Sequence, residues 1–158
     1  MSNTTTSRMT NPAVTLEGAM DALQGLSKSV SRARVGINLD LVRLRASQIN
    51  ACSWCVDMHS KAARKAGESD ERLIAVSAWR ETPYFSDPER AALALTEALT
   101  RIADGADQIS DALWAECSEH FDADQLGGLI LEISHINLWN RLNVATRQMV
   151  VVDEQSWG

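Results

Sequence analysis

The sequence lacks any hydrophobic run long enough to cross a bilayer. Its longest apolar stretches, near residues 126–131 and 149–152, fall far short of the roughly 20 residues that a transmembrane helix needs. It also does not begin with a basic segment followed by an apolar one, which is the pattern of a secretory signal. We therefore expect a cytoplasmic protein that makes no use of a membrane.

Cysteine is scarce as well, with only three in 158 residues. So few cysteines cannot supply the several disulfides that hold small secreted domains together. In a cytoplasmic protein, a small number of cysteines favours catalytic or redox use.

The sequence also has no excess of basic residues. It contains 15 Lys and Arg and 21 Asp and Glu, which gives a net charge of −6. This balance argues against a nucleic-acid partner. The charge is uneven, however. Residues 28–65 carry eight Lys and Arg against two Asp, a net of +6, so the remaining residues carry −12. These basic residues form either a positive field that favours thiolates or a solvated helix face.

No segment shows the alternation of apolar and polar residues that marks a β-strand, and apolar residues recur at helical spacing instead. The fold class predicted is therefore all-α, with about six or seven helices in one domain. The expected division is a loose arm over residues 1–13 and a helical domain over 14–152. The helices are expected to begin near residues 14, 38, 51, 69, 86, 110 and 122.

Several helix ends carry specific signals. Gly67 suits the position after a helix C-terminus, where a left-handed backbone is common. Ser86 with Glu89, and Asp122 with Gln125, have the spacing of a capping box at a helix N-terminus. The pair Gly127-Gly128 has no strand before it, so it predicts close helix packing and not a phosphate loop.

The most informative motif is Cys52-x-x-Cys55-x-x-x-His59. In a helix that starts near Ala51, with Asn50 as N-cap, these three side chains share one face. Unpaired N–H groups and the helix dipole at that end favour a thiolate. His59 lies one turn beyond Cys55, where it can act as a base or hydrogen-bond partner. The motif predicts a redox dithiol.

Two alternatives remain at this point. The first is a structural zinc site, in which Cys117 and His120 join Cys52 and Cys55 as ligands. The long helical gap before Cys117 is unlike a compact zinc module, and we expect no bound metal. The second is that the cysteines are inert core residues, as free cysteines often are.

Beyond these residue-level arguments, the sequence resembles the AhpD-like alkylhydroperoxidase branch of the carboxymuconolactone decarboxylase superfamily. The resemblance covers essentially residues 14–150. It is carried by residues 40–60 with the two cysteines and the histidine, and by residues 78–81, 85–95 and 136–142. Decarboxylase members of the superfamily lack the cysteine pair, so this chain is similar to the redox branch.

The resemblance implies roles for four residues. Cys55 would attack the peroxide, and Cys52 would condense with the resulting sulfenic acid to form a disulfide. His59 would belong to the proton relay. Asp40 occupies the position of a family glutamate in that relay, so the carboxylate is kept on a shorter side chain. Trp54 stands where well-known members have a histidine.

The function expected is therefore a thiol-dependent peroxidase that needs no cofactor, with a peroxide substrate and a thiol or protein reductant. The resemblance and the five tryptophans also predict a homo-oligomer, a trimer or a hexamer. The alternatives are a disulfide reductase or redox sensor with weak peroxidase activity, and a non-catalytic helical scaffold.

Overall fold

The computed structural model describes residues 6–151, which form helices and no strand. The all-α prediction is confirmed. The α-helices span Pro12–Thr15 (α1), Ala19–Ala33 (α2), Leu39–Ile49 (α3), Ser53–Lys65 (α4), Asp70–Ala75 (α5), Asp87–Thr100 (α6), Asp111–His120 (α7) and Ala123–Thr146 (α8). Two 3₁₀ segments, Val76–Glu81 and Ile102–Asp104, follow α5 and α6. No helix among these residues has the length and apolar character needed to cross a membrane.

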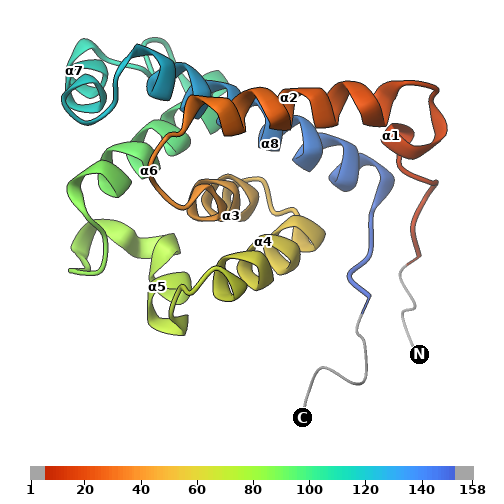
Figure 1. Ribbon diagram of the computed structural model, residues 1–158. Helices are drawn as coiled ribbons and strands as arrows, with labels where there is room; N and C mark the ends of the chain where they lie inside the picture. Colours follow the sequence, from red (N-terminus) through yellow and green to blue (C-terminus); the bar gives the residue numbers. More distant parts are fainter. Residues whose placement is uncertain (1–5, 152–158) are drawn as a thin grey trace.

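Helix α3 lies at the centre of the molecule, between α8, α4 and α6 (Figure 1). It contributes to two separate hydrophobic clusters. Val42 packs with residues of α6, α7 and α8, while Leu41 and Leu44 pack with α4, α5 and the Val76–Glu81 segment. Because apolar residues cover two sides of α3, its polar residues point into the remaining directions, where the candidate site lies.

The long helix α8 lies antiparallel to α2 (Figure 1). The close approach depends on Gly128, since a Cβ atom there would overlap the Cβ of Ala33 on α2. The predicted helix packing at this glycine is confirmed, whereas Gly127 has open space around its Cα. The pair of helices forms one wall of the cavity described below.

Most predicted helix ends agree with the structure. Ser86 and Asp122 both form capping boxes, and Gly67 adopts φ +102° just past the end of α4. The prediction of a single helix beginning near residue 14 is wrong. The chain forms the short α1, turns at Gly18 with φ +77°, and only then starts α2.

The predicted loose arm, residues 1–13, begins with five residues that lie outside the described part of the chain. Beyond them, the backbone N–H of Arg8 donates to the carbonyl of Thr146, and the buried Asn11 donates to Asn143 on α8 at 2.7 Å. Residue 152, the predicted end of the helical domain, also lies outside the described residues.

Candidate redox site

The cysteine pair lies at the turn between α3 and α4 and forms a disulfide, with Cα atoms 5.3 Å apart. The turn departs from the sequence-based prediction. Asn50 caps the C-terminus of α3, and the N-cap of α4 is Cys52 itself. Between them Ala51 adopts φ +52°, a backbone conformation that costs a residue with a Cβ about 1–2 kcal/mol. This turn places Cys55 in the first turn of α4 and buries both cysteines.

Capping gives the two sulfur atoms different surroundings. The Sγ of Cys52 accepts the backbone N–H of Cys55 at 3.4 Å, in the manner of an N-cap side chain. The Sγ of Cys55 instead accepts a hydrogen bond from the side-chain amide of Asn143 at 3.3 Å. Asn11 donates to the Asn143 carbonyl oxygen, which fixes the amide with its N–H₂ toward the sulfur.

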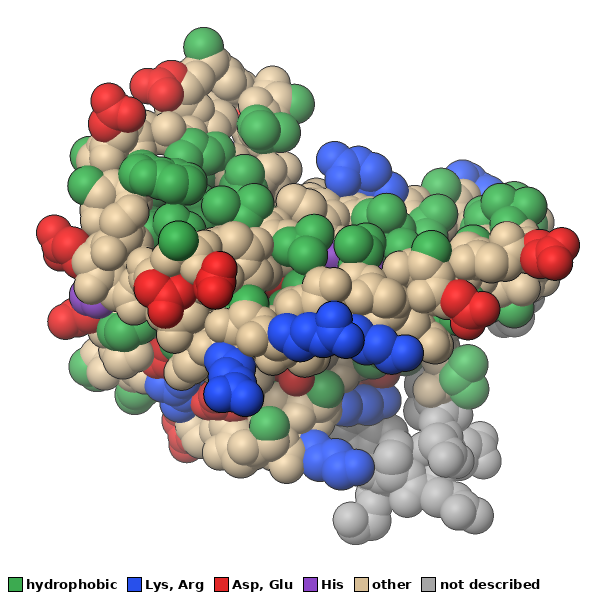
Figure 2. Space-filling view, turned by 45° about the horizontal axis from the view of Figure 1, so that its top comes forward, with side chains coloured by type: hydrophobic (Ala, Val, Ile, Leu, Met, Phe, Trp, Pro, Cys, Tyr) green, Lys and Arg blue, Asp and Glu red, His purple; other side chains and the backbone are tan. Residues whose placement is uncertain are grey.

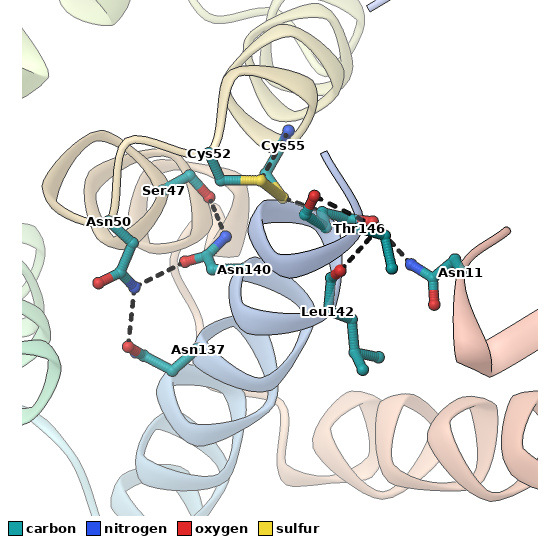
Figure 3. Close-up of a disulfide and its surroundings, with 10 residues drawn as sticks. Asn11, Ser47, Asn50, Cys52, Cys55, Asn137, Asn140, Leu142 and Thr146 are labelled. Carbon is teal, nitrogen blue, oxygen red and sulfur yellow. Dashed lines mark hydrogen bonds between the residues drawn. A yellow bond between two sulfur atoms is a disulfide. The ribbon is translucent and has the colours of Figure 1, made fainter. Parts of the chain in front are cut away.

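Asn143 is the last of three buried asparagines spaced three residues apart on α8, and the other two, Asn137 and Asn140, are labelled in Figure 3. The side chain of Asn50 donates to Asn137 and to Asn140, each at 2.9 Å, and Asn140 donates to Ser47 at 3.0 Å. These bonds join the turn that carries the cysteines to α8. Side-chain hydrogen bonds to α8 therefore hold the disulfide in place, in addition to apolar packing.

A cavity of about 440 Å³ opens between α3, α4 and α8, and Cys55 and His59 both line it. Much of its wall is apolar. The apolar lining comes from Trp54, Met58, Ile136 and Trp139. The polar lining consists of Ser27, Arg43, His59, Glu132, His135 and Asn143. A cavity of this size can accept a small organic molecule.

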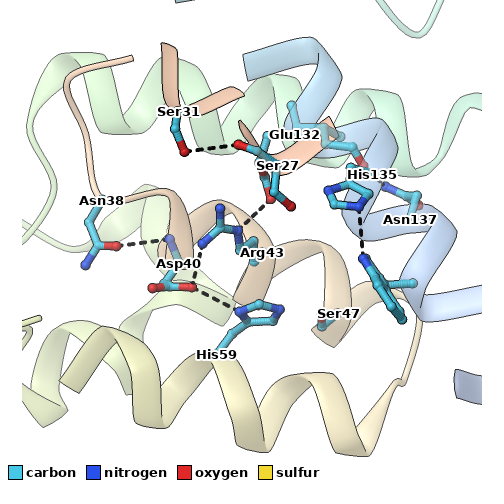
Figure 4. A network of polar contacts seen from close by, with 12 residues as sticks. Ser27, Ser31, Asn38, Asp40, Arg43, Ser47, His59, Glu132, His135 and Asn137 are labelled. Atoms are coloured by element: carbon cyan, nitrogen blue, oxygen red, sulfur yellow. Dashed lines mark hydrogen bonds and ion pairs between the residues drawn. The ribbon is translucent and has the colours of Figure 1, made fainter. Parts of the chain in front are cut away.

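His59 is oriented by Asp40, whose Oδ1 lies 3.0 Å from its Nδ1 (Figure 4). A carboxylate at this distance accepts the Nδ1–H, which leaves Nε2 of the neutral ring as a base. Arg43 also binds the Asp40 carboxylate, at 3.1 Å. Burial by itself would raise the pKa of Asp40, but the hydrogen bond from His59 and the charge and hydrogen bond of Arg43 lower it below the ordinary 3.8.

Arg43 continues this network to α8, where its Nε donates to Oε1 of Glu132 at 2.5 Å. The second oxygen of Glu132, Oε2, is buried and accepts no hydrogen bond from the described residues. His135, one turn further along α8, accepts the indole N–H of Trp139 at its Nε2 (Figure 4). Its proton therefore resides on Nδ1, and burial lowers the pKa of His135 more than the neighbouring Glu132 raises it.

The structure thus places the four predicted site residues along α3, α4 and the turn between them, with Asp40 near the start of α3 and the cysteines beyond its end. Asp40 contacts His59 directly, although its side chain is shorter than that of the family glutamate. No hydrogen bond joins His59 to Cys55 in the disulfide form described.

Sequence reasoning did not identify Arg43, Glu132, His135 or Asn143 as site residues. One signal was available: Asn137, Asn140 and Asn143 recur every three residues along a helix whose neighbouring positions include several large apolar residues. The expected positive field is also reduced. Arg43 and Arg45 are neutralised by Glu132 and Glu97, which lie far away in the sequence.

The zinc alternative does not fit the described residues, which contain no cluster of three or more His, Cys, Asp or Glu side chains. Cys117 is buried in a hydrophobic cluster with residues of α6 and α8. Burial raises its pKa to about 11, so this thiol is neutral and unreactive at ordinary pH.

Comparison with known proteins agrees with this geometry. Residues 38–98 match the carboxymuconolactone decarboxylase family. The uncharacterized protein YdfG of Bacillus subtilis (strain 168) is 41% identical over 106 residues, which are 67% of this chain and 71% of YdfG.

Solved structures show the same relationship. A protein of unknown function from Agrobacterium tumefaciens, assigned provisionally as the antioxidant defence protein AhpD, is 33% identical with a TM-score of 0.83. The match covers 94% of this chain and 100% of that one. An uncharacterized peroxidase-related protein from Silicibacter sp. TM1040 shares the fold at 19% identity, with a TM-score of 0.69 over 83% of this chain and 69% of that one. The chain belongs to the carboxymuconolactone decarboxylase family, in its AhpD-like branch.

Proposed function

We propose that this protein is a thiol peroxidase that reduces organic hydroperoxides through the Cys52–Cys55 pair. The observation that carries the proposal is the position of Cys55. It is disulfide-bonded to Cys52, and it lines a largely apolar cavity together with a histidine that a carboxylate orients. A dithiol that closes to a disulfide can supply the two electrons that a peroxide bond takes up.

In the proposed cycle the Cys55 thiolate attacks the terminal oxygen of the hydroperoxide. The O–O bond breaks, Cys55 becomes a sulfenic acid, and the alkoxide leaves and takes a proton from the relay of His59 and Asp40. The Cys52 thiol then attacks the sulfenic sulfur, which releases water and forms the disulfide. An external dithiol restores both thiols, and it is itself oxidised to a disulfide.

Two features support Cys55 as the attacking residue. Its Sγ accepts a hydrogen bond from the side-chain amide of Asn143. Such a donor stabilises a thiolate more than a thiol. Cys55 also lines the large cavity, whereas Cys52 borders a separate cavity of about 380 Å³ with Arg147 and Gln148. Peroxide and reductant would then approach the pair from different sides.

The test is consumption of cumene hydroperoxide by the purified protein with dithiothreitol as reductant. Cys55→Ser should abolish turnover. Cys52→Ser should undergo one oxidation and retain a sulfenic acid at Cys55 that a dimedone-type reagent labels. A label on Cys52 in the Cys55→Ser protein, with turnover retained, would reverse the two roles.

A second candidate is dithiol–disulfide exchange with a protein partner, and the separate cavity beside Cys52 favours it. In that case the disulfide would be reduced and re-formed rapidly by dithiols, but hydroperoxide would be consumed no faster than by free dithiothreitol. The same assay therefore separates the two functions.

We also propose that the protein acts as a homo-oligomer, a trimer or hexamer. Large hydrophobic side chains are exposed on the surface, and Figure 2 shows such side chains gathered on one face. Exposed large hydrophobic residues occur on several separate elements, among them Leu16, Ile74 and Trp114 at 63%, 76% and 46%. Contiguous exposed apolar surface is typical of association sites. Light scattering that gives a monomer at micromolar concentration would exclude this.

A further inference from the structure

Only one of the two carboxylate oxygens of Glu132 has a hydrogen-bond donor among the described residues. Its Oε1 accepts a hydrogen bond from Arg43, while its Oε2 is buried without a donor among the described residues. The side chain is 3% exposed and belongs to the lining of the cavity that Cys55 also lines. A buried acceptor without a partner is costly, so its presence at a cavity wall points to a ligand that supplies the donor.

This acceptor lies far from the reacting sulfur. Asn143, which donates to Cys55, is eleven residues beyond Glu132 on α8, which corresponds to about 16 Å along the helix axis. Glu132 therefore cannot contact the peroxide oxygens while Cys55 attacks them. It can only contact the opposite end of a molecule that fills the cavity.

The local charge decides which group would bind there. One guanidinium, Arg43, stands against two carboxylates, Asp40 and Glu132, so the network carries a net negative charge. His135 adds no compensating charge, because its Nε2 accepts from Trp139 and it is neutral. A carboxylate on the ligand would meet repulsion, whereas a neutral hydroxyl can donate to Oε2.

We propose that Glu132 forms a second recognition point in the cavity and selects substrates with an apolar body and a neutral hydroxyl group remote from the reacting end. The inference rests on the proposed function, because the ligand is a substrate only if the protein is a peroxidase. The class of hydroperoxide selected would be uncharged and hydroxyl-bearing, and not a free carboxylic acid. The binding itself requires no turnover.

The test uses three unreactive probes on the disulfide form: 4-phenylbutan-1-ol, its methyl ether, and 4-phenylbutanoate. Dissociation constants come from ligand-observed NMR or from quenching of the tryptophans that line the cavity. The alcohol should bind roughly tenfold more tightly than the ether, which lacks the donor, and than the carboxylate. This comparison between ligands needs no variant.

Glu132→Gln provides the matched variant. Its remaining carbonyl oxygen can still accept from Arg43, while an amide N–H₂ replaces the free oxygen and the negative charge is lost. The preference for the alcohol should disappear, and the carboxylate should gain affinity. Glu119→Gln, an exposed carboxylate on α7, is the control and should keep the wild-type preference.

Equal binding of alcohol and ether, tighter binding of the carboxylate, an unchanged preference in Glu132→Gln, or no binding of any probe would each overturn the inference. None of these results depends on peroxide reduction. Conversely, absence of hydroperoxide turnover with a clear alcohol preference would refute the peroxidase and leave the recognition point in place.

Discussion

Two buried carboxylates, Glu97 and Glu132, each accept a hydrogen bond from an arginine of α3. They differ in how many of their oxygen atoms have a hydrogen-bond donor. Glu97 on α6 accepts Arg45 and the Trp79 indole on one oxygen and Arg80 on the other. Glu132 on α8 accepts only Arg43, on one oxygen. Arg43 and Arg45 are two residues apart on α3, so they leave the helix toward different neighbours.

This difference indicates a structural role for Glu97 and a ligand-binding role for Glu132. Glu97 joins α3, the Val76–Glu81 segment and α6, and it is not part of the lining of the Cys55 cavity. Glu132 borders the cavity that holds Cys55. A fully satisfied buried charge holds elements together, whereas a partly satisfied one at a cavity keeps capacity for a ligand.

The largest expected effect is loss of the Glu97 cluster. Glu97→Ala should lower the free energy of unfolding by about 3–5 kcal/mol, because it leaves the buried Arg45 without its partner. Urea denaturation measures this, with Glu119→Ala as an exposed control that changes by about 0.5 kcal/mol or less. A loss below about 1 kcal/mol would place Glu97 among ordinary surface pairs.

The same cluster predicts a pH dependence. Burial would raise the pKa of Glu97, but hydrogen bonds from Arg80, Arg45 and Trp79 lower it below the ordinary 4.5. A depressed carboxyl pKa gives stability that is complete above 4.5 and is lost as the pH falls through the folded-state value. Wild type should therefore lose stability more steeply below pH 4.5 than Glu97→Gln.

On the cavity side, removal of the donor to the sulfur should have the next largest effect. Asn143→Ala should slow the reaction of Cys55 with hydroperoxide about tenfold or more, since a hydrogen bond to a charged group contributes about 1.5–3 kcal/mol. Asn143→Asp should be slower still, because its carboxylate faces the thiolate. Stopped-flow rates equal to wild type in both variants would contradict this.

Asp40→Asn should have a smaller effect, acting through His59. The amide keeps the size of Asp40 but removes the charge that stabilises an imidazolium. In a Cys52→Ser background, the pH midpoint for alkylation of Cys55 should rise by about one unit, equivalent to about 1.4 kcal/mol.

The neutral Cys117 thiol should not interfere with this measurement, because its pKa is about 11. Asp40→Glu, the family residue, should keep or lower the midpoint. Superimposable profiles for Cys52→Ser with and without Asp40→Asn would mean that Asp40 does not influence the pKa of Cys55.

The smallest effect on stability is expected at Glu132. Glu132→Gln keeps an oxygen for Arg43 and gives up no hydrogen bond at Oε2, so the free energy of unfolding should change by about 1 kcal/mol or less. Glu97→Gln is the matched comparison and should cost more, because both Glu97 oxygens accept bonds. Equal losses in the two variants would mean that both carboxylates are structural.

The sequence by itself determined the features that depend on neighbouring residues. Helical periodicity gave the all-α fold, and capping boxes at Ser86 and Asp122 gave two helix starts, because these signals act within one turn. The spacing of Cys52, Cys55 and His59 likewise fixed their common helix face. Local rules failed at Gly18 and Ala51, where the backbone turns with positive φ.

Only the tertiary structure decided which distant groups complete the site. Glu132 meets Arg43 across 89 residues, and Asn143 meets Cys55 across 88. Such contacts leave no local pattern, because they depend on how α8 packs against α3 and α4. The sequence therefore defines the cysteine pair and its spacing. Helix packing brings the Asn143 donor to the Cys55 sulfur and Glu132 to the wall of the cavity.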